Sequence, residues 1–310
     1  MLTWILVFGI PRGLMTMGKM TIATAFLGKF LRSIRGIPKL SSMVLLCLIV
    51  CGIFAGSLSS HNPEIGELKE RLLPPCWQEG GVTKYLLGTD LMGRDILSRL
   101  IYGTRISLIV SFSAVIVASF LGTILGVISG FLGGVVDQVI MRFTDAWYSI
   151  PLVMFGVLLA VTLGPGTLNI VIIISLVSWA RYARVSRGLT LSLKSRDFIH
   201  LATIAGCGKV RIMVQHILPN VMNSMITLAS LQIGVVVVME ASLTFLGVGV
   251  PPPKPAWGLM LAEGKSGLYT GHWWLITFPG LAIAMLVMSF NLLGDWLRRR
   301  LDPHFRYLWE

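Results

Sequence analysis

The chain has 310 residues, of which 55% are hydrophobic and only 13% are charged, and its mean hydropathy is +0.79. Soluble domains are about a quarter charged, so this composition excludes an ordinary soluble protein and indicates several membrane-spanning helices. The formal net charge is +12. Because the basic residues lie between apolar stretches, the charge indicates orientation in a lipid membrane and no binding to nucleic acid.

The N-terminal segment combines a short apolar stretch with scattered basic residues. Residues 1–10 are too few to span a bilayer, which takes about 20 residues, and they lack the features of a secretory signal. Met15, Met17 and Met20 leave a later start open. Lys and Arg recur between residues 12 and 39, so we expect residues 1–40 to form a basic cytoplasmic tail.

Apolar runs predict an all-α membrane protein with six transmembrane helices. The runs are residues 41–59, 106–130, 148–180, 221–248 and 273–293. The third run is too long for one span, and the turn-forming sequence Leu163-Gly-Pro-Gly-Thr167 divides it into two. We therefore expect a first transmembrane helix at residues 41–59 and a five-helix core at residues 106–297.

The distribution of basic residues predicts the orientation of these helices. Most of the 26 Lys and Arg residues lie before the first span, between the fourth and fifth spans, and near the C-terminus. Cytoplasmic segments carry the excess of Lys and Arg in membrane proteins. Both termini, including residues 298–310, are therefore predicted to be cytoplasmic.

Residues 60–105 form the predicted outer connection. Its first part is rich in Pro, Glu and Gly and indicates an irregular loop. From Leu91 to Ile101, apolar residues recur at helical spacing opposite Arg94, Asp95 and Arg99. This pattern predicts an amphipathic helix at the membrane surface, and periodicity alone does not distinguish an ordinary surface-seeking helix from a functional one.

Three glycines in the second span are predicted to serve helix packing. Gly122, Gly126 and Gly130 fall at four-residue intervals on one helix face. Small residues at this spacing allow a neighbouring backbone to approach closely where lipid supplies no hydrophobic drive.

Three charged residues follow beside the third span, namely Asp137, Arg142 and Asp145. Polar groups at membrane depth need partners whatever the function, so a structural role is favoured. Arg142 and Asp145 are three positions apart and could pair on a helix.

Motifs for catalysis and metal binding are absent from the sequence. There is no G-x-x-x-x-G-K-[ST] motif, because Gly208-Lys209 is followed by Val210, and neither HExxH nor GxSxG occurs. The four cysteines and five histidines show no metal-ligand or disulfide spacing. The chain is therefore predicted not to be an enzyme and to hold no metal.

Glu240 is the one acidic residue well inside an apolar span. A carboxylate in hydrocarbon is costly unless it is paired or faces water, so it is a candidate gate or pathway residue. The alternative is a hydrogen bond that closes the outer end of its helix, and the sequence leaves both open.

The segment from Phe198 to Pro219 is a polar-interrupted insertion between two apolar runs. Residues 199–205 predict one short helix, Gly206 and Gly208 break it, and residues 210–218 predict a second helix that Pro219 ends. Such a pair could dock in a groove of a partner protein or pack within the chain.

The insertion resembles the EAA loop of ABC-importer permeases. The resemblance rests on His200-x-Ala202-x-x-x-Gly206, followed by Ile217-Leu218-Pro219. His200 stands where the family usually has glutamate, and Leu201 replaces the first alanine. The resemblance implies that residues 198–219 couple to an ATPase through Ile199, His200, Leu201, Ala202, Gly206 and Pro219.

Two further stretches resemble the C-type permeases of dipeptide, oligopeptide and nickel importers. The first contains Asp90, Gly93, Arg94, Asp95, Arg99 and Arg105 in GTDxxGRDxxSRxxxGxRxSL. The second begins at Glu240 in EASLTFLGVG and continues with PPxPAWGLML. Together with the insertion, the resemblance covers residues 85–305.

This resemblance implies one permease subunit of an importer in the bacterial cytoplasmic (inner) membrane. It implies a second, related permease, two ATPase subunits and an extracytoplasmic substrate-binding protein as partners. ATP and Mg²⁺ would then bind the ATPase subunits, and this chain would hold no cofactor. Di- or oligopeptides are the expected cargo, with nickel or a metal chelate as the alternative. A passive channel or exporter subunit is the alternative of a different class.

Overall fold

The computed structural model describes residues 38–301, and the predictions for residues 1–37 and 302–310 lie outside this range. Regular secondary structure in the described range is helical, which confirms the all-α class. The helices are α2 (Lys39–Ile53), α3 (Ala55–Leu58), η1 (Leu68–Glu70), α4 (Ile96–Leu132), α5 (Gly134–Tyr148), α6 (Leu152–Leu163), α7 (Thr167–Lys194), α8 (Asp197–Ile204), α9 (Lys209–Ile212), η2 (Met213–Ile217), α10 (Leu218–Phe245), α11 (Trp257–Gly264), η3 (Lys265–Thr270) and α12 (Trp274–Leu301).

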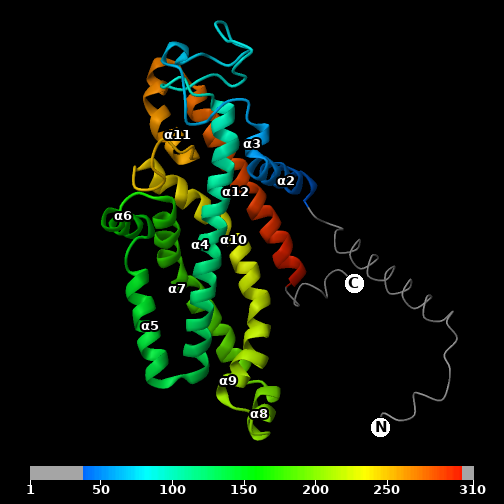
Figure 1. Ribbon diagram of the computed structural model, residues 1–310. Coiled ribbons are helices and arrows are strands. Elements are labelled where there is room, and N and C mark those ends of the chain that lie inside the picture. Colours follow the sequence, from blue (N-terminus) through cyan, green and yellow to red (C-terminus); the bar gives the residue numbers. More distant parts are fainter. Residues whose placement is uncertain (1–37, 302–310) are drawn as a thin grey trace, which may run out of the picture. The chain divides into compact units, whose positions relative to one another are not determined.

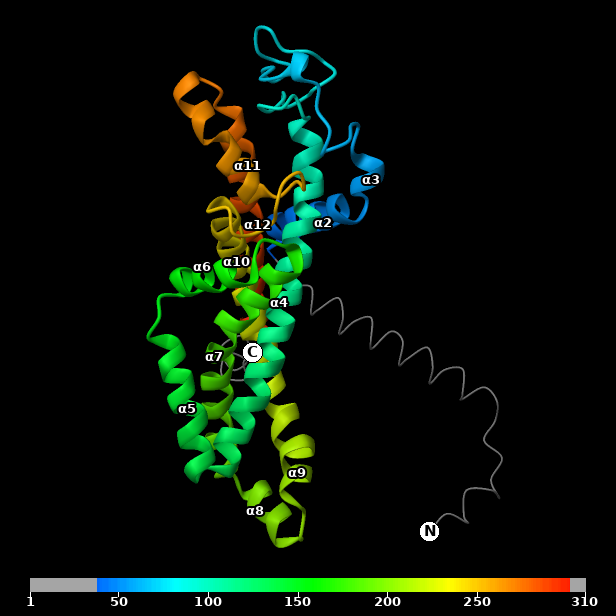
Figure 2. The same cartoon turned by 60° about the vertical axis from the view of Figure 1, so that its left-hand side comes forward.

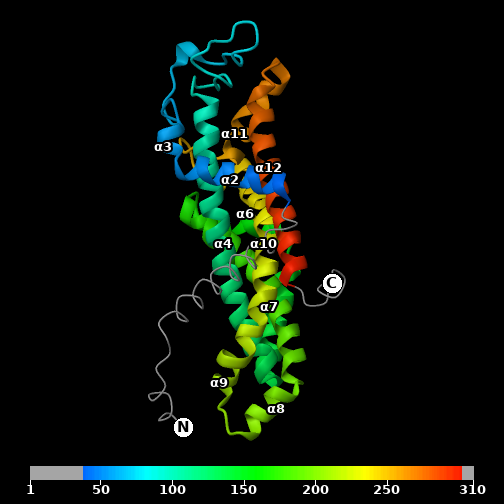
Figure 3. The same cartoon turned by 90° about the vertical axis from the view of Figure 1, so that its right-hand side faces the viewer.

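Four helical stretches of the described chain are long and apolar enough to cross a membrane. They are Ile96–Leu132, Thr167–Lys194, Lys209–Phe245 and Trp274–Arg300. The bent pair formed by α5 and α6 makes a fifth candidate if it counts as one span. Helix α2 is shorter than a usual span, and it runs across α4 and α12 instead of along them (Figures 1 and 3). The described residues therefore hold four or five candidate spans.

The start of α4 differs from the sequence prediction. No separate amphipathic surface helix forms, because α4 begins at Ile96 and continues without a break for 37 residues. At about 1.5 Å per residue it is about 55 Å long, which exceeds the hydrocarbon thickness of about 30 Å. The polar face around Arg99 is buried against protein carboxylates, so it does not require a water-exposed surface.

The third span was predicted to occupy the part of residues 148–180 that precedes the Gly-Pro-Gly turn. Its predicted boundaries are wrong. α5 ends at Tyr148, and α6 has only 12 residues and is bent by 92° from α5. Pro151 disfavours a helical conformation at Ile150, so the chain turns between the two helices (Figure 2). The predicted turn before Thr167 is confirmed, since α6 ends at Leu163 and α7 begins at Thr167.

Helices α4 and α7 pack closely along the glycine face of α4. A Cβ atom on Gly122 would lie 2.3 Å from the carbonyl oxygen of Trp179, and one on Gly126 would lie 1.9 Å from Ser186 Oγ. On Gly130 it would lie 2.9 Å from the carbonyl oxygen of Arg187. The absence of side chains at these glycines lets the two backbones meet, as in other membrane helix pairs.

The described chain has two distinct ends. Helices α8 and α9 lie at one end of α4, α7 and α10, whereas α11 and the loop before α4 lie at the other (Figures 1 and 2). The predicted helix end at Pro219 is wrong, because Pro219 lies in the first turn of α10. A π-helical turn at Met213–Ile217 precedes it. Proline has no N–H and its ring crowds the carbonyl four residues earlier, and the wider turn accommodates it.

Candidate functional site

The loop before α4 is shaped by the side chain of Asp90. Its Oδ1 accepts hydrogen bonds from the backbone N–H groups of Met92, at 2.8 Å, and Arg94, at 2.9 Å. Gly93 adopts a φ of +74°, and a Cβ atom there would lie 2.0 Å from the carbonyl oxygen of Glu67. This position therefore requires glycine.

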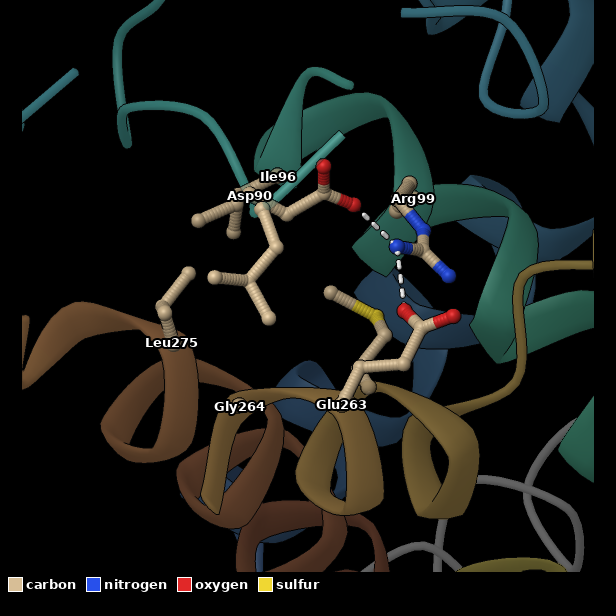
Figure 4. A pocket seen from close by; sticks show the side chains of 8 residues that line it. Asp90, Ile96, Arg99, Glu263, Gly264 and Leu275 are labelled. Carbon is tan, nitrogen blue, oxygen red and sulfur yellow. Dashed lines mark hydrogen bonds and ion pairs between the residues drawn. The ribbon is translucent and has the colours of Figure 1, made fainter. Parts of the chain in front are cut away.

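The same carboxylate organises a buried ionic cluster, which comprises Asp90, Arg94, Arg99 and Glu263. Asp90 Oδ2 accepts from Arg94 Nε at 2.7 Å and also pairs with Arg99 Nη1. Glu263 Oε2 accepts from Arg94 Nη2 and from Arg99 Nη1, each at 2.8 Å. Figure 4 shows Arg99 between the two carboxylates, with Glu263 on α11. The cluster joins the loop before α4, the start of α4 and α11.

A small cavity of about 10 Å³ lies beside the ionic cluster, lined in part by Asp90, Arg99 and Glu263 (Figure 4). This volume is about that of one water site. The Nε and Nη2 atoms of Arg99 have no hydrogen-bond partner among the described residues, and Arg99 is only 1% exposed. The cluster is therefore a polar core element with room for a single solvent molecule.

Asp95 and Arg105 belong to the same sequence motif as Asp90 but lie outside the ionic cluster. Asp95 caps α4, where its carboxylate accepts from Leu97 N at 3.3 Å and from Ser98 N at 3.1 Å. Such a cap satisfies N–H groups that have no partner within the helix. Arg105 is exposed on α4 and takes no part in the ionic cluster.

Glu240 is fully buried in α10. Its carboxylate accepts hydrogen bonds from Ser107 Oγ, on α4, and from Thr244 Oγ1, each at 3.0 Å. It lines neither the small cavity beside the ionic cluster nor the larger cavity described below. The geometry therefore favours a hydrogen-bonded link between α4 and α10 over a residue on an open pathway.

Two ion pairs connect α5 to α7. Asp137 binds Arg187 with both carboxylate oxygens, at 2.6 Å to Nε and 2.6 Å to Nη2. Asp145 pairs with Arg184 at 2.8 Å. The predicted pairing of Asp145 with Arg142 is therefore replaced by a bond to another helix, and Arg142 is exposed on α5.

The insertion after α7 forms a short helix with one buried and one exposed face. Ile199 is buried, and Ala202 is half-buried in the same apolar cluster. His200 is exposed, and its side chain makes no hydrogen bond within residues 38–301. Leu201 is 65% exposed and Ile204 is 82% exposed. An apolar surface of α8 is thus left uncovered.

A glycine-based cap ends α8. Gly206 has a φ of +79°, its N–H donates to the Thr203 carbonyl at 3.0 Å, and the Cys207 N–H donates to the Ala202 carbonyl at 3.0 Å. This pair of backbone hydrogen bonds is the Schellman motif, which favours glycine at the left-handed position. The exposed Pro219 lies beyond it, at the start of α10.

A larger cavity of about 440 Å³ lies beside the bend between α5 and α6. Its lining comes from α5, α6, the link between them, α7 and α10. The polar lining residues are Ser178 and Arg181 on α7 and Gln232 on α10, and the rest of the lining is mainly apolar and aromatic. Cavities of this size and composition are typical of binding sites for small molecules.

Sequence reasoning did not identify Glu263 or the cavity residues Arg181 and Gln232 as site residues. Glu263 is 169 positions from Arg94, so no local pattern linked the two. Gln232 offered a signal, because it is a polar residue inside an apolar run. Its role depends on the cavity, which forms only where α5, α6, α7 and α10 pack together.

Residues 122–307 match the family of binding-protein-dependent transport system inner membrane components. The chain is 38% identical, over 85% of its length and 87% of the relative, to the di/tripeptide transport system permease protein of Pseudomonas aeruginosa. It is 40% identical, over 84% of its length and 88% of the relative, to the dipeptide transport system permease protein of Haemophilus influenzae. It is 36% identical, over 89% of its length and 97% of the relative, to the nickel transport system permease protein of Escherichia coli.

Proposed function

Because the chain belongs to the family of inner membrane components of binding-protein-dependent transport systems, we propose that it forms half of a peptide translocation path. It is a multi-pass permease subunit of an ABC importer, and ATP hydrolysis belongs to separate subunits. Relatives named for dipeptide transport are 38% and 40% identical to it over most of both chains. This similarity carries the proposal that the cargo is a di- or oligopeptide.

The exposed face of α8 is the proposed contact with an ATPase subunit. Leu201 and Ile204 are largely exposed there, at the end of the long helices opposite α11 (Figure 1). An apolar helix face suits a groove on a partner protein. Movement of the ATPase subunits would be transmitted through α8 to α7 and α10, and the helices would alternate between inward-open and outward-open arrangements.

Six spans with both termini in the cytoplasm remain the proposed topology. In this arrangement α2 supplies the first span, and the bent pair of α5 and α6 supplies the third. An exposed apolar side of α2 supports contact with lipid or with the second permease, and it includes Leu40, Met43, Leu46 and Ile53. The concentration of Lys and Arg near α8 supports its cytoplasmic position.

The proposed complex contains this chain, a second related permease, two ATPase subunits and an extracytoplasmic substrate-binding protein. ATP and Mg²⁺ would bind only the ATPase subunits. A bacterial cytoplasmic membrane is the expected location, because the relatives named above come from bacteria.

The test is peptide uptake by the complex in proteoliposomes. We expect dialanine uptake that requires ATP and the binding protein. Substitution of Leu201→Asp with Ile204→Asp should abolish co-purification of the ATPase subunits, because it charges the apolar face of α8. Ile65→Asp, at another exposed apolar position far from α8, is the matched control. Unchanged co-purification in the α8 variant, or uptake without ATP, would exclude the coupled mechanism.

Nickel is the second candidate cargo, because the nickel permease relative covers 89% of the chain at 36% identity. Within residues 38–301 there is no group of three or more His, Cys, Asp or Glu residues arranged to hold a metal. The lack of such a group in the described residues favours a peptide over a bare nickel ion as the cargo. Uptake of radioactive nickel, with no uptake of dialanine by the same complex, would reverse the assignment.

A further inference from the structure

The large cavity beside the α5–α6 bend carries polar groups whose hydrogen-bonding capacity is unused. Gln232 is 6% exposed and Ser178 is 9% exposed, and both line this cavity. Neither side chain makes a hydrogen bond to another residue within the range 38–301. The side-chain polar atoms of both residues are accessible from the cavity, so solvent or a ligand in the cavity can satisfy them.

Electrostatics determine which ligand fits the cavity. Arg181 is the one charged residue among those that line it, and its guanidinium forms no ion pair with any described residue. The neighbouring Arg184 and Arg187 on the same helix are both paired with aspartates of α5. Arg181 is exposed, so a solute can reach its guanidinium, and guanidinium groups bind carboxylates with charge-assisted hydrogen bonds.

The remaining lining suits the body of a short peptide. Trp147, Tyr148 and Phe155 supply aromatic surface, and the cavity volume of about 440 Å³ lies within the usual range for small-molecule sites. No Asp, Glu, His or Cys lines the cavity. A bare divalent cation would find no charged ligand there and would be repelled by Arg181.

We propose that this cavity is a transit site for the cargo, in which Arg181 binds the C-terminal carboxylate of a short peptide. Gln232 and Ser178 hydrogen-bond to the same end of the peptide, and the aromatic side chains contact its apolar parts. The inference rests on the proposed peptide import. It adds a place within this chain where the cargo is held after it leaves the binding protein.

The experiment measures thiol labelling in the assembled complex, with the four native cysteines replaced by serine. Val235→Cys places a thiol in the cavity wall, and Val238→Cys is the matched control on the same helix outside the cavity. The two valines are 45% and 46% exposed. The probes are an anionic sulfonate and a cationic trimethylammonium methanethiosulfonate reagent, with dialanine or dialaninamide as competitor during ATP turnover.

We expect dialanine to slow labelling of Val235→Cys by about tenfold, since a charge-assisted hydrogen bond accounts for about that factor in affinity. Dialaninamide, which lacks the carboxylate, should protect much less. The anionic reagent should react faster than the cationic one, and Arg181→Gln should remove both this preference and the protection. Arg181→Lys should restore part of each, and Gln232→Leu should weaken the protection while leaving the reagent preference.

Equal protection at Val235→Cys and Val238→Cys, or protection that survives Arg181→Gln, would overturn the inference. Normal dialanine import with no protection at Val235→Cys would overturn the transit site and leave peptide import standing. A complex that imports nickel and no dialanine would overturn the proposed cargo and, with it, the carboxylate site. These outcomes separate failure of the inference from failure of the proposed function.

Discussion

Arg99, in the first turn of α4, and Glu263, in α11, are 164 positions apart in the sequence and meet at 2.8 Å between Nη1 and Oε2. Arg99 is almost fully buried, whereas the Glu263 side chain is 26% exposed. This contact fixes α11 to the start of α4 together with the loop before α4, which carries Asp90. Loss of the Glu263 charge leaves the two arginines of the cluster with the single carboxylate of Asp90, so the buried positive charge is no longer fully compensated.

Glu263→Gln should therefore lower the stability of the chain. A fully buried partner would cost about 3–5 kcal/mol, and we expect about 2 kcal/mol here because Glu263 is partly exposed to solvent. Thermal unfolding in detergent measures the change. Glu64→Gln, at an exposed acidic residue of the same loop before α4, is the control and should leave the melting temperature unchanged. Equal melting temperatures for both variants would contradict the structural role of the cluster.

Gly126→Ala should separate α4 from α7. The added Cβ would meet Ser186 Oγ at 1.9 Å and the Ala183 carbonyl oxygen at 2.3 Å, and backbone atoms of α7 cannot move aside locally. Overpacking of this kind costs about 1–3 kcal/mol or more. Gly188→Ala, on α7, meets nothing within 4 Å and should be neutral or slightly stabilising. The two variants are compared by their yield of monodisperse protein and by their melting temperature. Similar values for both would refute the close contact between α4 and α7.

Asp137→Asn should destabilise the chain more than Asp145→Asn. Asp137 forms two bonds of 2.6 Å to Arg187, and its side chain is 18% exposed, whereas Asp145 and Arg184 are 59% and 50% exposed. A paired and partly buried charge contributes about 1.5–3 kcal/mol, and an exposed pair contributes about 0–1 kcal/mol. Thermal unfolding at low and high salt tests the ranking, and a larger effect at Asp145 would reverse it.

Glu240→Gln should leave import within about twofold of the unsubstituted complex, because Glu240 lines neither cavity and its neighbours are two hydroxyl donors. The glutamine amide keeps one acceptor, so we expect a loss of about 1 kcal/mol in stability. Dialanine uptake at equal amounts of assembled complex is the measurement. Uptake lost without loss of assembly would show that the carboxylate itself takes part in transport.

The loop before α4 should respond to acid through Glu70. Hydrogen bonds from Lys84 and from Tyr85 hold the pKa of Glu70 below its ordinary value of 4.5. Its contribution to stability is therefore complete above that value and is lost as pH falls through the lowered pKa. The pKa of Lys84 is raised, mainly by its hydrogen bond to Glu70, so its contribution is complete below 10.5 and is lost only at higher pH.

Amide hydrogen exchange at Thr89 measures this response, because Thr89 donates to the Leu73 carbonyl at 3.0 Å in the same loop. Protection relative to the Glu70→Gln variant should fall below about pH 4.5. The variant has no carboxyl group at this position, so its own profile should lack this acidic transition. An acidic transition of the same size in both proteins would exclude Glu70 as its cause.

Several features followed from local sequence because their causes are local. Apolar composition predicted a helical membrane protein, and the Gly-Pro-Gly turn predicted the division between α6 and α7. The four-residue spacing of Gly122, Gly126 and Gly130 predicted one packing face, which lies against α7. Helix period, turn preference and residue size act over a few positions, so a single stretch contains the information.

Other features depended on contacts that no local pattern specifies. Three helix boundaries differed from the predictions: α4 starts at Ile96, the chain bends after α5, and the helix continues past Pro219 into α10. Burial and the neighbouring turns override local propensity at helix ends.

By itself, then, the sequence determined the membrane class, the position of most apolar helices and the resemblance to importer permeases. Only the tertiary structure decided that Arg99 meets Glu263, that Asp145 binds Arg184, and that Arg181 faces the same cavity as Gln232. The physical reason is that a charged or amide side chain finds its partner in space and not along the chain. That partner comes from a distant helix, whose position is set by the packing of the whole bundle.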